Sequence, residues 1–286
     1  MTLLKSVYIS TYMTVATILA ITAAQEIGHG GNWRSWAGLL LATAPFVAFI
    51  SWIMLTRSVA RTSPRFPLIS ALGAAGIALS AWGYFKDGNS VPLILSVAAV
   101  AAFQAYNFWY SDFGRKPSRA LKTGEILPNV SFTNTQGNVV GVDQLKGKPT
   151  IWVFIRGNWC PLCMAQVKEL ATEYEGLDAA GVRVALISPQ PQGHTQALAK
   201  RLGVNFEFLI DSDLSASRAL GVFIANGLPL GMQVLGYQSD TVMPTVVITD
   251  AENRIVWAHE TDNYRVRPEP EIFVEVLRSK GFVAPV

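Results

Sequence analysis

Four long stretches of the first 110 residues contain no charged residue, and this feature limits the fold of the chain more than any other. Each stretch is close to the ~20 residues, or ~30 Å of helix, that crossing a bilayer requires. Glycine and alanine are frequent within them, which allows helices to pack closely. The sequence therefore predicts an all-α, four-helix transmembrane domain at residues 1–110. The four stretches are 6–24, 36–56, 66–85 and 91–110.

The basic residues that flank these stretches are distributed unequally between the two sides of the predicted membrane. One side has only Arg34 and Lys86. The positive-inside rule places the more basic side in the cytoplasm. We therefore expect an integral membrane protein, of a bacterial inner membrane, in which the part of the chain after residue 110 faces the cytoplasm; a periplasmic orientation is the alternative. The more basic side carries Lys5, Arg57, Arg61, Arg65, Arg115, Lys116, Arg119 and Lys122.

The two parts of the chain differ in charge. Residues 1–123 hold three acidic and ten basic residues, whereas residues 124–286 hold seventeen acidic and thirteen basic ones. The mildly basic total therefore does not indicate nucleic-acid binding. We interpret residues 111–123 as a basic linker and residues 124–286 as a separate soluble domain.

Two cysteines, Cys160 and Cys163, are the only ones in the chain, and they follow an apolar run at residues 151–155. The run predicts a buried strand, and the helical spacing of apolar residues after Cys163 places both cysteines at a helix N-terminus. Such a terminus favours a thiolate, and one helical turn lets the two sulfurs form a disulfide. The pattern predicts a dithiol redox site with no cofactor beyond its own disulfide.

Two other roles for the cysteine pair are less well supported. A structural zinc site needs about four ligands. The remaining two would have to come from three histidines that lie far apart in the sequence. The cysteines could instead be unreactive core residues, since free cysteine is often buried. We favour the redox role and expect no metal.

Strand and helix patterns alternate through the C-terminal part. Such an alternation predicts an α/β sandwich with a mixed sheet. A hairpin is expected around the turn at residues 134–138. Further strands are expected at 182–188, 206–210, 245–249 and 255–259, and helices from the cysteines to 181 and at 195–202, 214–220 and 269–280.

From Gly124 onward the sequence resembles the redoxin superfamily of thioredoxin fold, and within it the AhpC/TSA branch. The resemblance is strongest to peroxiredoxin-like proteins with an Arg-Gly-x-Trp-Cys-Pro-x-Cys motif. It implies a thioredoxin-like α/β fold, a mixed sheet flanked by helices, in this half of the chain only. The motifs are Leu127-Pro128-x-x-x-Phe132, Leu145-Lys146-Gly147-Lys148-Pro149, Trp159-Cys160-Pro161-Leu162-Cys163 and Asp262-x-Tyr264-x-x-Arg267-x-Glu269-Pro270.

The resemblance implies two different mechanisms, of which disulfide exchange is our first hypothesis. In thioredoxin-type members the first cysteine attacks and the second resolves, beside a cis-proline loop. Cys160 would then attack the disulfide of a protein partner, and Cys163 would resolve the mixed disulfide. A cis bond before Pro244 would present backbone groups to that partner. The residues expected to border the substrate groove are Trp159, Pro161, Met243 and Pro244.

The second hypothesis is a thiol-dependent peroxidase. In peroxiredoxins the peroxidatic cysteine lies three residues after a threonine and pairs with an arginine just before a later strand. Counting from the end of the first buried strand, Cys163 occupies the peroxidatic position and Cys160 that of the threonine. Met243-Pro244 stands where the arginine is expected. Arg156 or Arg267 would then have to stabilise the thiolate or the leaving oxygen of hydrogen peroxide or an alkyl hydroperoxide.

A third hypothesis comes from another class of protein. The C-terminal domain would be a redox-responsive or inert binding module, and the helical bundle a membrane scaffold that acts through a partner. All three hypotheses include contact with a lipid bilayer, and they leave assembly into a homo-oligomer open. The apolar, glycine-rich insertion at residues 223–237 would cover the substrate or contact the membrane or another subunit.

Overall fold

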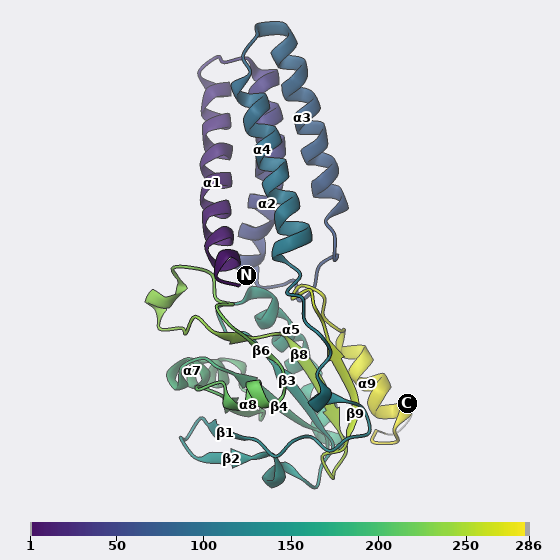
Figure 1. Cartoon of the computed structure of the whole chain (residues 1–286). Coiled ribbons are helices and arrows are strands. Elements are labelled where there is room, and N and C mark those ends of the chain that lie inside the picture. The colour runs from purple at the N-terminus through teal and green to yellow at the C-terminus, as the bar shows by residue number, and fades with distance from the viewer. Residues whose placement is uncertain (1, 284–286) are drawn as a thin grey trace. The chain divides into compact units, whose positions relative to one another are not determined.

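The computed structural model describes residues 2–283, and the chain divides into two compact units (Figure 1). The first comprises Leu3–Thr56 and Ser63–Phe113. The second comprises Arg57–Thr62 and the chain from Gly114 onward. The segment between the second and third helices therefore belongs to the same unit as the cysteines.

The first unit contains the four helices that the apolar stretches predict. They are α1 (Thr2–Gly28), α2 (Trp33–Thr56), α3 (Pro67–Asp87) and α4 (Val91–Ala105), the last continuing as the π-helix η1 (Tyr106–Tyr110). All four, with η1 counted as part of the fourth, are long and apolar enough to cross a membrane. The prediction of four long apolar helices is confirmed, and their insertion in a membrane stays a prediction.

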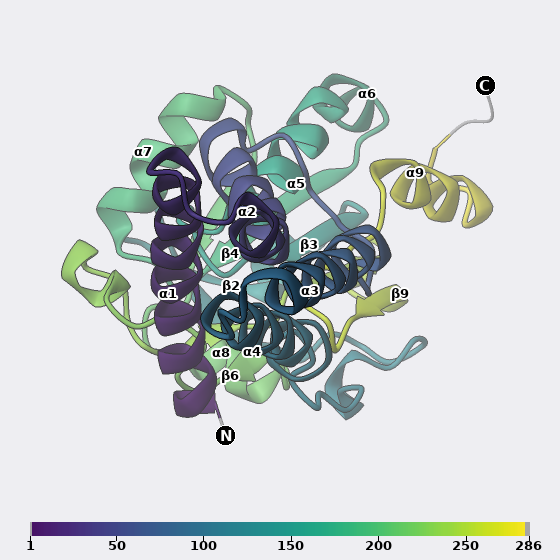
Figure 2. The same cartoon turned by 90° about the horizontal axis from the view of Figure 1, so that it is seen from above.

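Helices α2 and α3 lie side by side (Figure 2). Small residues form the contact between them. A Cβ atom on Gly76 would lie 2.6 Å from the carbonyl oxygen of Gly38, so nothing larger than glycine fits without a shift of the backbone. The buried hydroxyl of Ser80 donates to the Ser35 carbonyl at 3.0 Å and lies 2.8 Å from the hydroxyl of Ser96 on α4. Such hydrogen bonds satisfy polar groups that have no access to water.

The second unit contains a seven-stranded mixed sheet in the order β2-β1-β5-β4-β3-β8-β9. The three central strands β3, β4 and β5 are parallel, whereas β1, β8 and β9 pair antiparallel with their neighbours. This arrangement confirms the predicted α/β fold. The strands are β1 (Ser131–Asn134), β2 (Val139–Gly141), β3 (Thr150–Phe154), β4 (Arg183–Ser188), β5 (Glu207–Ile210), β8 (Thr245–Thr249) and β9 (Ile255–Glu260).

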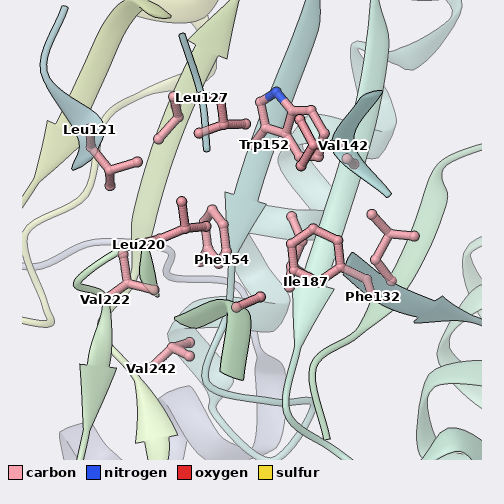
Figure 3. Packing of buried hydrophobic residues seen from close by; sticks show 14 of the residues in the cluster. Leu121, Leu127, Phe132, Val142, Trp152, Phe154, Ile187, Leu220, Val222 and Val242 are labelled. Atoms are coloured by element: carbon pink, nitrogen blue, oxygen red, sulfur yellow. The ribbon is translucent and has the colours of Figure 1, made fainter. Parts of the chain in front are cut away.

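The core of this unit forms because alternate residues of the central strands point to the same face of the sheet. Trp152 and Phe154 of β3 pack with Ile187 of β4 in one cluster (Figure 3). The Trp152 indole N–H is satisfied by Thr249 Oγ1 at 3.0 Å. The helices are α5 (Pro161–Thr172), α6 (Tyr174–Ala179), α7 (Gln192–Leu202), α8 (Ser215–Ala219) and α9 (Pro270–Ser279), with short 3₁₀ turns η2 (Arg119–Leu121), η3 (Val142–Leu145) and η4 (Met232–Leu235).

Two features differ from the expected elements. The cysteine helix was expected to continue to residue 181, but it ends at Thr172, and α6 follows after Glu173. The ring of Tyr174, the first residue of α6, packs edge-on against Phe206 at 5.3 Å. Two short strands, β6 (Phe223–Ile224) and β7 (Thr241–Val242), also pair within the segment expected to be a loop. Strands of two residues carry no periodic pattern from which to predict them.

The predicted linker makes buried hydrogen bonds and an ion pair within the second unit. Arg115 donates to Glu260 Oε2 at 2.6 Å and to Thr245 Oγ1 at 2.7 Å, and both charged side chains are largely buried. Glu260 also accepts the backbone N–H of Ser118 at 2.9 Å. The chain from Gly114 is therefore a structural part of the second unit.

Candidate active site

Both cysteines lie in the first turn of α5, directly after the central strand β3. Cys160 is the N-cap of the helix, and its Sγ accepts the backbone N–H of Cys163 at 3.3 Å. Pro161 occupies the first helical position, where its missing N–H costs nothing. The local sequence thus caps the helix with one sulfur and places the other one turn further along.

The turn before Cys160 depends on a glycine. Gly157 has φ of +140°, and a Cβ atom there would lie 2.7 Å from the ring of Trp159. The Trp159 indole N–H donates to the Arg156 carbonyl at 3.2 Å, and Thr241 donates to the same carbonyl at 3.1 Å. These contacts bring the chain sharply from β3 into the cysteine helix.

Arg267 is the basic group that contacts the sulfurs. Its Nη2 lies 3.3 Å from Cys163 Sγ and 3.7 Å from Cys160 Sγ. Gln166 accepts from Nη1 at 2.9 Å, and the carbonyl of Tyr264 accepts from Nε at 3.2 Å. Because the side chain is only 5% exposed, these partners fix its orientation. The guanidinium therefore presents one edge to both cysteines.

The surroundings shift the pKa values of the two cysteine thiols in opposite directions. Burial by itself would raise the pKa of the Cys163 thiol, but hydrogen bonds from Cys160 and Arg267, the charge of Arg267 and the backbone of Arg156 lower it to about 5. Burial, followed by the hydrogen bond to Cys163 and the charge there, raises the pKa of Cys160 well above its usual range. The surroundings of the pair therefore favour ionisation of Cys163 over that of Cys160.

Arg156 is close to the cysteines but makes different contacts. Its guanidinium donates to the carbonyl of Gly227 and lies over the rings of Trp159 and Tyr264, at 4.7 and 5.0 Å from their centroids. The side chain is buried. Of the two arginines that the sequence proposes, Arg267 has the hydrogen bonds to sulfur.

The four residues expected to border a groove have different environments. Trp159 and Pro161 are half-buried beside Cys160, whereas Met243 and Pro244 are buried. The expected cis bond before Pro244 is wrong, because residues 2–283 contain no cis peptide bond. The N–H of Met243 donates to the Val222 carbonyl at 2.8 Å, next to the β6–β7 pair, and a trans bond is the lower-energy state of X-Pro.

Several residues of the site were not predicted. Gln166 orients Arg267, and its position three residues after Cys163 places it on the same helix face, a spacing that could have been used. Gln190 accepts the backbone N–H of Asn158 at 2.7 Å. The sequence carries no signal for Gln190, because the parallel pairing of β3 and β4 brings it there.

Residues 225–240, which we call the covering loop, contact the turn before the cysteines at both ends. Near its start, the Gly227 carbonyl accepts from Arg156. Near its end, the Tyr237 hydroxyl donates to Asn158 Oδ1, and its ring packs edge-on against Trp159 at 6.5 Å. Cys160 is 2% exposed and Cys163 0% exposed. The sulfurs are thus closed off from bulk water.

The mixed sheet and the buried dithiol at a helix N-terminus define the second unit as a thioredoxin-like redoxin, a class of thiol oxidoreductase. Residues 123–258 match the model of the AhpC/TSA family. The chain therefore carries an AhpC/TSA peroxiredoxin-like domain in this region, as the sequence motifs predicted.

Similar proteins include peroxiredoxins from plants and bacteria. The chain is 28% identical over 102 residues to "Peroxiredoxin Q, chloroplastic" of Triticum aestivum, covering 36% of this chain and 47% of that protein. It is 23% identical over 158 residues to "Peroxiredoxin Bcp" of Escherichia coli strain K12, covering 55% and 96%. A peroxiredoxin-like protein from Aquifex aeolicus superimposes with a TM-score of 0.48 at 15% identity, covering 58% and 91%. The chain thus spans about half the length of the wheat relative and almost all of the bacterial one.

Proposed function

We propose that this protein is a membrane-anchored thiol peroxidase in which Cys163 reacts with the hydroperoxide and Cys160 resolves. The observation that carries the proposal is the contact of Arg267 with both sulfurs, together with the opposite pKa shifts of the two thiols. The nucleophile of a peroxidase must be a thiolate, and its neighbour must keep a proton to donate. Cys163 and Cys160 meet these two requirements respectively.

In the first step the Cys163 thiolate attacks the terminal oxygen of the hydroperoxide. The O–O bond breaks, and its electron pair leaves on the other oxygen, which takes a proton from the Cys160 thiol. Arg267 faces the region where negative charge moves from sulfur to the leaving oxygen, so its N–H groups stabilise the transition state. The products are a sulfenic acid on Cys163 and an alcohol or water.

In the second step the Cys160 sulfur attacks the Cys163 sulfur. An S–S bond forms, and the hydroxyl of the sulfenic acid leaves as water once it is protonated. The two thiols have then supplied the two electrons that reduce the hydroperoxide. A dithiol protein restores the pair by two thiol–disulfide exchanges. No bound cofactor is needed in either step.

Thiol–disulfide exchange without peroxide is the second candidate. The CxxC spacing at the N-terminus of α5 supports it, because such a pair interconverts readily with its disulfide. Its usual nucleophile is the first cysteine of the pair, however, and the raised pKa of Cys160 makes that thiol the weaker nucleophile at neutral pH. The protonation states therefore favour the peroxidase.

The orientation in the membrane is also a proposal. We infer that the redox domain faces the cytoplasm, where glutathione and thioredoxin keep thiols reduced. The excess of Lys and Arg on the side of the chain termini supports this orientation. Labelling an engineered cysteine at exposed Lys116 with a membrane-impermeant maleimide, in intact cells and in inverted vesicles, tests it.

The test of the proposed activity uses the full-length protein in detergent. Reduced wild type, Cys160→Ser and Cys163→Ser are mixed with hydrogen peroxide, and peroxide and thiol are followed by stopped flow. We expect wild type to react rapidly in the first turnover. Cys160→Ser should react more slowly, because a serine hydroxyl is a far weaker acid than the Cys160 thiol, and dimedone should trap its sulfenic acid. Cys163→Ser should be inert. A fast reaction that persists in Cys163→Ser, or slow peroxide consumption with rapid disulfide exchange in wild type, would contradict the proposal.

A further inference from the structure

The covering loop ends in an exposed apolar tip. The 3₁₀ turn η4 (Met232–Leu235) lies between Gly231 and Gly236, whose φ values of +97° and +87° few other residues adopt. Three large apolar side chains of this segment are exposed to solvent. They are Leu230, Val234 and Leu235, with exposed fractions of 50%, 86% and 57%. Large apolar side chains clustered on one short turn commonly mark a contact surface.

The chemistry around the tip identifies the kind of surface it fits. No charged residue occurs between Arg218 and Asp240, a stretch that includes the whole tip. Its polar groups are backbone amides and uncharged side chains such as Gln233, which donates to Ser239 Oγ at 3.2 Å. An apolar tip without charge can enter the boundary between lipid headgroups and acyl chains at little electrostatic cost.

The connectivity of the chain favours the bilayer over another protein as the surface that the tip contacts. The last candidate span ends at Tyr110, and the second unit begins at Gly114. Residues 111–113 reach at most about 10 Å when extended. Arg57–Thr62, between the second and third spans, belongs to the second unit as well. A lipid surface is therefore always present at high effective concentration, whereas another protein must first diffuse to the site.

We propose that the tip of the covering loop, formed by Leu230, Val234 and Leu235, contacts the lipid bilayer that the chain's own helices span. The loop joins this tip to the cysteine turn through Gly227 and Tyr237. Contact with the bilayer therefore acts on the loop that shields the two sulfurs from water. The contact with lipid does not depend on the proposed peroxidase activity. Its effect on the reduction of lipid hydroperoxides rests on that activity.

The first experiment measures the contact itself in full-length protein. Because the chain has only two cysteines, Cys160→Ser/Cys163→Ser is a clean background for single labels. An environment-sensitive fluorophore is attached to Val234→Cys and, as the control, to Val139→Cys, which is 70% exposed on a hairpin of the same unit. Each protein is reconstituted in phosphatidylcholine–phosphatidylglycerol vesicles with or without nitroxide-labelled acyl chains.

We expect nitroxide lipids to remove about half or more of the emission at position 234, as for a group at the acyl-chain boundary, and to leave position 139 unchanged. Equal, weak quenching at both positions would overturn the proposal. So would emission at position 234 that resists lipid quenchers and changes with the protein-to-lipid ratio, because the tip would then contact a second copy of the chain.

The second experiment separates this inference from the proposed function. Val234→Asp/Leu235→Asp is compared with Val139→Asp in vesicles containing a phospholipid hydroperoxide or supplied with hydrogen peroxide. Loss of two buried apolar contacts should slow consumption of the phospholipid hydroperoxide about tenfold or more, with the hydrogen peroxide rate unchanged. Equal rates for both variants on the lipid substrate would contradict a functional contact. If wild type consumes neither peroxide, the proposed function fails, and the quenching result still decides the contact.

Discussion

Arg267 Nη2 lies 3.3 Å from Cys163 Sγ although the two residues are 104 positions apart in the sequence. The arginine follows β9, which is an edge strand of the sheet. The cysteine follows β3, which is one of the three central strands. In the peroxiredoxin pattern the arginine is expected just before a strand such as β8, where this chain has Met243 and Pro244. The guanidinium therefore reaches the thiolate from a different segment of the chain.

Removing the guanidinium of Arg267 should impair the reaction with peroxide. Loss of a donor that stabilises developing negative charge typically costs about 10²–10³-fold in rate. We expect Arg267→Met to lose that much of the peroxide rate constant and to raise the pKa of Cys163, because its main cationic neighbour is gone. Stopped-flow rates and thiolate absorbance against pH measure both effects. Arg119→Gln, which changes an exposed arginine, is the control.

The pH dependence of the wild-type rate identifies the nucleophile. Because the pKa of Cys163 is lowered to about 5, the thiolate is fully formed above pH 6. The rate should therefore fall only as the pH drops through about 5, and it should be flat from pH 6 to 8. A rate that keeps rising above pH 8 would instead identify Cys160, whose pKa is raised, as the attacking group.

Gln166 should act on the rate through Arg267. Gln166→Ala leaves a buried guanidinium N–H without its acceptor, which costs on the order of 1–3 kcal/mol of stability. We expect a slower peroxide reaction and a raised pKa of Cys163, because the arginine is no longer held toward the sulfur. Gln166→Glu restores the acceptor and should recover most of the lost stability. Its carboxylate also offsets the charge of Arg267, so the pKa of Cys163 should stay raised. A purely structural role would change the melting temperature and leave the pH profile of the rate as in wild type.

The Tyr237 hydroxyl should help to keep the covering loop closed. Tyr237→Phe removes the hydrogen bond to Asn158 and keeps the ring. One such bond contributes about 1 kcal/mol, so the open state should become about fivefold more populated. Alkylation of Cys163 by a bulky maleimide should accelerate to the same extent, whereas reaction with hydrogen peroxide should change little. Unchanged maleimide kinetics would show that the loop does not limit access.

The ion pair between Arg115 and Glu260 should contribute far more to stability than an exposed one. Its side chains are only 5% and 11% exposed, so Glu260→Ala removes the carboxylate that pairs with a buried guanidinium and should cost roughly 3–5 kcal/mol. The control is Lys146→Ala, which breaks an exposed pair with Asp143 and should cost less than about 1 kcal/mol. Thermal unfolding of the full-length protein in detergent compares the two. Similar melting temperatures for both variants would contradict the prediction.

Features that depend on residues close together in the chain could be predicted from the sequence. The four long apolar helices follow from uncharged apolar runs of sufficient length. The position of Cys160 and Cys163 at a helix N-terminus follows from a β-branched run, a turn and a helical repeat. Three of the four family motifs lie within residues 123–258, which the match to AhpC/TSA covers, and the fourth, at residues 262–270, lies beyond the match.

The lowered pKa of Cys163 and the contact of Arg267 with the sulfurs depend on the tertiary structure. Both depend on distances between segments far apart in the chain, and these distances are set by the pairing of β3 with β8 and of β8 with β9. That pairing carries Arg267 to the sulfurs, while Arg156, closer in sequence, contacts the carbonyl of Gly227. Burial then makes each hydrogen bond at the sulfurs count strongly, because no water competes for them. Local sequence records neither the burial nor the contact.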